Sequence, residues 1–153
     1  MADAKIGEGF TILVVDDAYP MRRIIQTYLE AVGFKVLLAE KVSIGLEMAK
    51  QNHPNLIISD WMMPEATGIK LVSMLREDAE LKHVPVIICT AKGTKEDVVE
   101  ALKKGVSDFI RKPFTKDVLI EKVRTLLASA PPSPLAGTVL DPNASVAPSV
   151  AGA

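Results

Sequence analysis

Five short apolar runs recur along the chain, and they constrain its fold more than any other feature. The runs are FTILVV (10–15), KVLLA (35–39), NLIIS (55–59), VPVIICT (84–90) and VSDFI (106–110). Each run is brief and nearly continuous, which is typical of parallel strands that are buried on both faces. The runs therefore predict five buried strands.

Segments with helical spacing of apolar residues separate these runs. The first helix is expected to begin near Pro20 and to end at Gly33. The others are expected over about 42–51, over about 67–76, from Thr94 to Gly105 and from Thr115 onward. Because strand and helix alternate five times and crossovers are right-handed, the pattern predicts an α/β fold with a doubly wound parallel sheet.

The size and charge of the chain exclude several classes of protein. Its 153 residues fit one compact domain. The formal net charge of -1 gives no electrostatic footprint for nucleic acid or anionic lipid, and no apolar run approaches the length of a membrane span. The start of the chain lacks the features of a secretory signal, and the single Cys89 cannot form an internal disulfide. We therefore expect a cytoplasmic protein that binds no nucleic acid and does not insert into a membrane.

Composition divides the chain into three parts. We expect a flexible N-terminus over residues 1–8, a folded domain over 9–128 and a tail over 129–153 that is rich in alanine and proline. The tail has little apolar surface to offset the entropy of ordering, so we expect it to be disordered. It could instead be a linker to a further domain, or a peptide that docks a partner through Leu135, Val139 and Leu140.

Polar side chains collect at the carboxyl ends of the expected strands, where open parallel sheets bind ligands. They are Asp16 and Asp17 after the first strand, Asp60 at the end of the third, Thr90 at the end of the fourth and Lys112 after the fifth. Taken singly, each has a structural explanation, such as a helix cap for an aspartate. Their conjunction favours a site. Three carboxylates held together repel one another unless a hard cation such as Mg²⁺ neutralises them, so a metal ion is implied.

These motifs resemble the receiver domain of bacterial two-component response regulators, in particular the single-domain CheY chemotaxis type. The matching stretches are VVDDAYPMRRII, SDWMMPEATG, VIICTAK and FIRKPF, which span about residues 9–127. Each motif is weak by itself, but the four are specific together, in this order and at these separations. The resemblance implies a flavodoxin-like and CheY-like fold, with five parallel strands in the order 2-1-3-4-5 and five flanking helices.

The resemblance also implies a role for each residue of the acidic site. Asp60 would be the phosphoacceptor for a sensor histidine kinase. Asp16 and Asp17 would hold Mg²⁺, for which Mn²⁺ can substitute, together with Asp60 and the backbone carbonyl of Met62. Lys112 would pair with carboxylate or phosphoryl oxygens, and its peptide bond to the following proline is cis in relatives. Phosphoryl transfer depends on positioning and charge neutralisation, which such groups supply.

A route from the phosphoryl group to a partner is implied as well. Thr90 would reach the phosphoryl oxygens through its hydroxyl group, and Phe109 would turn into the space thus vacated. Without the resemblance, Phe109 would be read as a core or half-buried strand aromatic. The fourth helix, fifth strand and fifth helix would then bind a downstream protein effector, such as a flagellar motor switch or a phosphotransfer protein. The protein is thus expected to be a switch and not an enzyme.

Three further positions bear on the site. Met62 and Lys92 stand where rapidly dephosphorylating chemotaxis regulators tend to carry polar or acidic residues, so a comparatively long-lived phosphoryl group is expected. Trp61 is expected to cover an edge of the site, although a simple surface aromatic is the alternative.

Three other functions are alternatives to this switch. A phosphatase of the haloacid dehalogenase type would carry its nucleophile on the first strand with a second aspartate two residues later, where this chain has Ala18. A flavin-binding module is disfavoured because the DDAYP segment would repel a phosphate. A phosphorelay intermediate remains open, since it differs from an effector-binding switch only in its partner.

Overall fold

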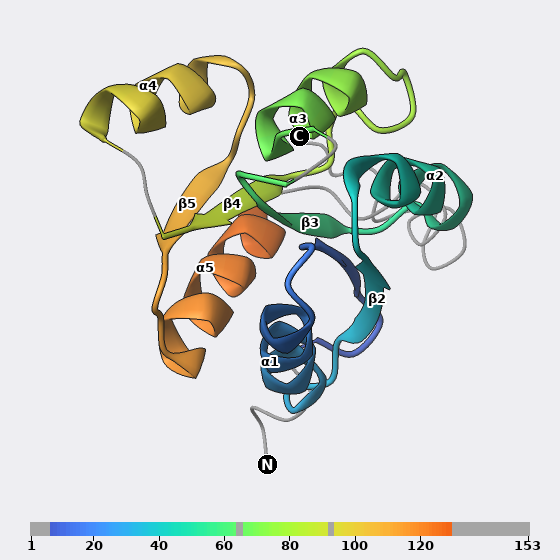
Figure 1. Cartoon of the computed structure of the whole chain (residues 1–153). Coiled ribbons are helices and arrows are strands. Elements are labelled where there is room, and N and C mark those ends of the chain that lie inside the picture. Colours follow the sequence, from blue (N-terminus) through green and yellow to red (C-terminus); the bar gives the residue numbers. More distant parts are fainter. Residues whose placement is uncertain (1–6, 64–65, 92–93, 130–153) are drawn as a thin grey trace.

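The computed structural model of the chain describes residues 7–63, 66–91 and 94–129, and it contains one five-stranded parallel sheet with the order β2-β1-β3-β4-β5 (Figure 1). The strands are β1 (Thr11–Val15), β2 (Lys35–Ala39), β3 (Leu56–Asp60), β4 (Val86–Thr90) and β5 (Asp108–Arg111). The helices are α1 (Tyr19–Glu30), α2 (Val42–Asn52), α3 (Gly68–Arg76), α4 (Lys95–Lys103) and α5 (Lys116–Ser129). The strand order, the parallel pairing and the five flanking helices confirm the predicted fold.

Two apolar layers hold the sheet between its helices. Helices α1 and α5 cover one face and α2, α3 and α4 cover the other (Figure 1). Along β4 the side chains alternate between these layers, with Ile88 on the side of α3 and with Ile87 and Cys89 on the side of α1 and α5. Burial on both faces explains why the strand sequences are nearly continuous apolar runs.

The expected strands agree with the structure to within two residues at each end. β4 begins two residues later than its apolar run, since Pro85 has no N–H to donate to the ladder. β5 begins two residues later than its run, and just before it the Ser107 hydroxyl accepts a hydrogen bond from the Val86 N–H at 3.0 Å. The Ser107 N–H also donates to the Val86 carbonyl at 2.8 Å, so the backbone and the side chain of Ser107 both bond to Val86 at this point.

Local signals explain where several helices begin and end. Thr94 and Asp97 form a reciprocal capping box at the start of α4. The Thr115 hydroxyl accepts a hydrogen bond from the Val118 N–H at the start of α5. Gly33 and Gly105 follow α1 and α4 with φ of 98° and 106°, a conformation that side chains with a Cβ rarely adopt.

The topology determines where a ligand can bind. β1 lies in the interior of the sheet, and the chain leaves it to β2 on one side and reaches β3 on the other. Such a switch point in strand order opens a crevice at the carboxyl ends of the two strands. Some expectations concern residues outside those described: most of the flexible N-terminus (1–6), Lys92, and the tail beyond Ser129.

Candidate functional site

Three aspartates meet at the carboxyl ends of β1 and β3. Asp16 and Asp17 follow β1 directly, and Asp60 is the last residue of β3. One carboxylate oxygen from each lies within 4.8 Å of the others. Asp16 is 1% exposed, Asp17 is exposed, and the side chain of Asp60 is 15% exposed. The structure thus brings together the three acids that the sequence singled out, in a cluster open to solvent on the side of Asp17.

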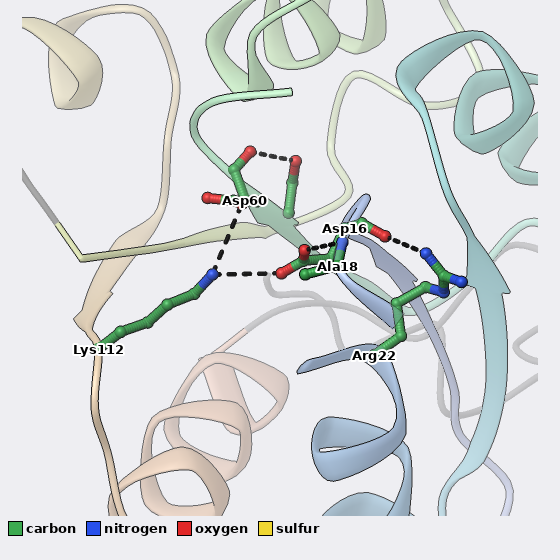
Figure 2. A network of polar contacts seen from close by, with 6 residues as sticks. Asp16, Ala18, Arg22, Asp60 and Lys112 are labelled. Atoms are coloured by element: carbon green, nitrogen blue, oxygen red, sulfur yellow. Dashed lines mark hydrogen bonds and ion pairs between the residues drawn. The ribbon is translucent and has the colours of Figure 1, made fainter. Parts of the chain in front are cut away.

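Asp16 is held by the turn that joins β1 to α1. The Ala18 N–H donates a hydrogen bond to Asp16 Oδ1 at 2.8 Å, and Arg22 Nη1 donates to the Asp16 carbonyl oxygen at 2.7 Å (Figure 2). The Asp16 N–H in turn donates to the Ala39 carbonyl at the end of β2. Sequence analysis did not identify Arg22, whose role depends on how the turn folds back on the strand.

Lys112 brings the one ammonium group of this network to the acids. Its Nζ lies 3.3 Å from Asp16 Oδ2 and 3.5 Å from Asp60 Oδ2 (Figure 2). Lys112 follows β5, and its backbone N–H donates to the Thr90 carbonyl at 2.8 Å. The peptide bond to Pro113 is cis, as the resemblance implied. The lysine therefore bridges the acids of two different strands.

The electrostatics of the cluster reflect an excess of negative charge. Burial is the largest influence on the pKa of Asp60 and raises it, and the negative charge of Asp16 raises it further. The positive charge of Lys112 lowers the pKa, but the net result lies above the ordinary value. Burial lowers the pKa of Lys112, but Asp16 and Asp60 raise it, and the net change is upward. Asp60 therefore holds its proton more tightly than a solvated carboxyl group does, although an ammonium group is beside it.

The segment that follows Asp60 is packed closely against α3. The Ser59 hydroxyl donates to the Asp60 carbonyl oxygen at 2.9 Å, and the Gly68 N–H donates to the Trp61 carbonyl at 2.7 Å. A Cβ at Gly68 would lie 2.3 Å from the Asp60 carbonyl oxygen, so only glycine fits there. This close approach, which sequence analysis did not identify, fixes the direction in which β3 ends.

The expected switch residues lie on the side of the sheet next to α3 and α4. Thr90 ends β4 and is buried, and Phe109 of β5 is half-buried against the core. Trp61 packs against the same core cluster, and its ring contacts that of Phe109. It is therefore not a simple surface aromatic. Met62 is 63% exposed beside the acids.

The donor set suits a hard divalent cation. Three carboxylate oxygens from two adjacent loops can converge on one ion, which would offset the mutual repulsion of the acids. Asp17 is the exposed member of the cluster. Asp16, Asp17 and Asp60 would thus hold a metal ion, and Asp60 is also within 3.5 Å of the ammonium group of Lys112.

Known proteins share both this sequence pattern and this fold. Residues 12–124 match the model of the family described as "Response regulator receiver domain". Over 120 residues the chain is 42% identical to the chemotaxis protein CheY1 of Helicobacter pylori, an alignment that covers 77% of this chain and 97% of that protein. The structure of the chemotaxis protein CheY4 of Vibrio cholerae superposes with a TM-score of 0.73 at 27% identity, over 76% of this chain and 97% of that one.

A larger protein is also similar. The phosphate regulon transcriptional regulatory protein PhoB of Pseudomonas aeruginosa is 35% identical over 140 residues, which are 88% of this chain. The chain spans 61% of the length of that relative. Among the helices in the described part of the chain, none has the length and apolar character needed to cross a membrane.

Proposed function

The chain belongs to the response regulator receiver domain family, and we propose that it is a phosphorylation switch whose acceptor is Asp60. One observation carries this proposal: Asp60 lies in a cluster of three carboxylates and also within 3.5 Å of the ammonium group of Lys112. A phosphoryl group is negatively charged, so it can approach Asp60 only when the negative charge of the three carboxylates is offset. Lys112 and a divalent cation would provide that offset.

The phosphodonor is proposed to be a sensor histidine kinase that carries phosphohistidine. A carboxylate oxygen of Asp60 attacks phosphorus, the P–N bond breaks, and the electron pair remains on the imidazole nitrogen, which takes up a proton. The product is an acyl phosphate on Asp60. Asp16 and Asp17, with the backbone carbonyl of Met62, would hold Mg²⁺ or Mn²⁺, which neutralises charge on the transferring oxygens. Lys112 then pairs with a phosphoryl oxygen.

The signal is proposed to leave the site through Thr90. Phosphorylation adds nearly two negative charges and strong acceptor oxygens, to which the Thr90 hydroxyl can donate. Phe109, on the neighbouring strand and half-buried, would then turn inward. The surface of α4, β5 and α5 would change shape and bind a protein effector. Relatives named as chemotaxis proteins make a flagellar motor switch one such effector, and a phosphotransfer protein is the other class.

The same site makes the protein a participant in its own phosphorylation and not an enzyme with turnover. The phosphoryl group is bound to the protein itself, and its loss by hydrolysis returns the chain to its starting state. With a histidine kinase as donor, the proposed reaction would take place in the cytoplasm.

The lifetime of the phosphoryl group is proposed to depend on Met62 and Lys92, neither of which is suited to orient an attacking water. Met62 is exposed at the edge of the acids, whereas Lys92 lies outside the described residues. Changing both, with Met62→Asn and Lys92→Glu, should shorten the lifetime about tenfold or more, the scale of a positioned group acting on water. The decay of ³²P-labelled protein measures it. An unchanged decay rate in the double variant contradicts the proposal.

Incubation with Mg²⁺ and acetyl phosphate, followed by intact mass, tests the function. The wild-type chain should gain the mass of one phosphoryl group, and Asp60→Asn should not. Addition of EDTA before the donor should abolish the gain. The proposal fails if Asp60→Asn retains the adduct, or if the wild-type chain releases many phosphates per molecule from small phosphate esters, as a phosphatase would.

A further inference from the structure

Two aromatic rings from non-adjacent parts of the sheet meet beside the acceptor. Trp61 follows Asp60 directly at the end of β3, Phe109 belongs to β5, and β4 lies between these strands. The ring centroids are 5.6 Å apart and the ring planes are inclined by 56°. This geometry lies in the range in which aromatic pairs attract each other. The contact therefore joins the acceptor segment to the edge strand without using β4 as an intermediate.

The two rings lie on the face of the sheet that α3 and α4 cover. Both pack against the same core cluster, which includes Ile88 of β4. Ile88 is the register partner of Phe109. Thr90, two residues further along β4, points to the same face as Ile88 because alternate residues of a strand share a face. Trp61 thus reaches Phe109 across the part of β4 that carries Thr90.

The backbone of Trp61 is tied to the acceptor on one side and to α3 on the other. Trp61 is joined to Asp60 by the peptide bond between them, and its carbonyl oxygen accepts from the Gly68 N–H at 2.7 Å. A change at Asp60 on phosphorylation can therefore reach the Trp61 ring, which Phe109 contacts directly.

We propose that Trp61 is a positioning residue whose ring holds Phe109 in its resting place, and that this contact sets how many unphosphorylated molecules adopt the active arrangement. The inference rests on the proposed function, because it requires Phe109 to change position when Asp60 is phosphorylated. A two-state equilibrium responds only to contacts that differ between the states. In this proposal the ring contact belongs to the resting state, and Phe109 gives it up on turning inward. Its removal therefore favours the active state.

The test measures how tightly the full chain binds beryllofluoride in the presence of Mg²⁺. Beryllofluoride forms a stable tetrahedral mimic of a phosphoryl group on a carboxylate, and ¹⁹F NMR detects the bound form. By linkage, a larger active population tightens this binding by up to the same factor. Trp61→Leu should bind about three- to tenfold more tightly than wild type, which is the scale of one aromatic pair. Trp61→Phe, which keeps a ring, should stay within about twofold.

A double-mutant cycle separates this role from a merely structural one. If Trp61 acts through Phe109, then Trp61→Leu should leave the affinity unchanged in a Phe109→Leu background. Tyr28→Leu is the matched control, since it removes the ring pair of Tyr28 with Phe114, at 6.4 Å, in the other apolar layer and should not change the affinity. The inference is overturned if Trp61→Leu does not tighten binding, if it acts equally in both backgrounds, or if Tyr28→Leu has the same effect.

A second measurement is independent of how well Trp61→Leu folds. Trp61 is the single tryptophan, so tryptophan emission, excited selectively over the two tyrosines, reports on its ring alone. Loading with Mg²⁺ and beryllofluoride should change the emission more in wild type than in Phe109→Leu, because only the wild-type ring pair is lost; an equal change in both contradicts the inference. The two proposals fail separately: without a phosphoryl adduct on the wild-type chain the proposed function fails, whereas an adduct without coupling between the rings refutes only the role of Trp61.

Discussion

Replacement of Asp60 by asparagine should stabilise the fold in the absence of metal ions, although it removes the proposed acceptor. The substitution keeps the shape of the side chain and removes one charge. Asp60 lies within 4.8 Å of two other carboxylates and 3.5 Å from one ammonium group. At an effective dielectric constant of about 20, each repulsion costs about 3.5 kcal/mol or more and the attraction contributes about 5 kcal/mol. These charges alone leave a balance of about 2 kcal/mol against the ionised form, which screening at the exposed Asp17 reduces to about 1 kcal/mol. Burial of the Asp60 carboxyl group, the largest cause of its raised pKa, acts in the same direction.

The dependence on pH gives this prediction its sign. The pKa of Asp60 is raised in the folded chain, so the folded state binds a proton that the unfolded state has released. Stability therefore falls as pH rises through the window between the ordinary pKa of 3.8 and the higher folded value. The gain in the free energy of unfolding of Asp60→Asn over wild type should be complete above that pH window and should shrink as the pH falls through it.

Urea unfolding in EDTA at pH 7, repeated at lower pH, measures the difference in the free energy of unfolding. The m-value should stay constant. Asp17→Asn is the matched control and should stabilise less, because its carboxylate is exposed. With Mg²⁺ at tenfold its Kd, wild type should gain about 1.4 kcal/mol and Asp60→Asn much less. The reasoning is refuted if Asp60→Asn is destabilised in EDTA at pH 7, or if its advantage does not depend on pH.

Three other substitutions test parts of the site and its support. Gly68→Ala should lower the free energy of unfolding by about 1–3 kcal/mol and weaken Mg²⁺ binding, because the new Cβ meets the Asp60 carbonyl oxygen. Urea unfolding and a Mg²⁺ titration measure the two effects, and an unchanged urea midpoint would contradict the prediction. Thr94→Ala should lower the free energy of unfolding by about 1 kcal/mol and speed amide hydrogen exchange in α4, since it removes the capping box. Exchange in α4 at the wild-type rate would contradict this prediction. Lys112→Met should cost about 2 kcal/mol in EDTA at pH 7, because it leaves the buried Asp16 and the partly buried Asp60 without their cation. A smaller loss of stability is expected in Mg²⁺, and equal losses with and without metal would contradict this interpretation.

Much of the fold and the acidic cluster could be predicted from the sequence. Apolar runs of strand length alternate with helical spacing, and in a parallel sheet every strand ends at the same edge. Asp16, Asp60 and Lys112 follow or end different strands, so the direction of the chain alone brings them to one edge. Their distances confirm that inference, although Asp16 and Asp60 are 44 residues apart in the sequence and Asp60 and Lys112 are 52 residues apart.

Other features could not be predicted because they depend on distances between side chains. Arg22 bonds a carbonyl six residues earlier, which requires the turn to fold back on β1. Gly68 is needed because α3 begins against the backbone of β3, a closeness that no spacing in the sequence encodes. Likewise, the contact of Trp61 with Phe109 spans 48 residues of sequence and depends on the width of β4 between them.

The central claim is that Asp60 is the acceptor, and chemical trapping tests it most directly. Borohydride reduces an aspartyl phosphate to homoserine, which peptide mass spectrometry locates in the sequence. After incubation with acetyl phosphate and Mg²⁺, homoserine should appear at position 60, and it should be absent from positions 16 and 17 and from samples treated with EDTA. Homoserine at Asp16 or Asp17, or none at any aspartate of a chain that has gained phosphate, would contradict the account.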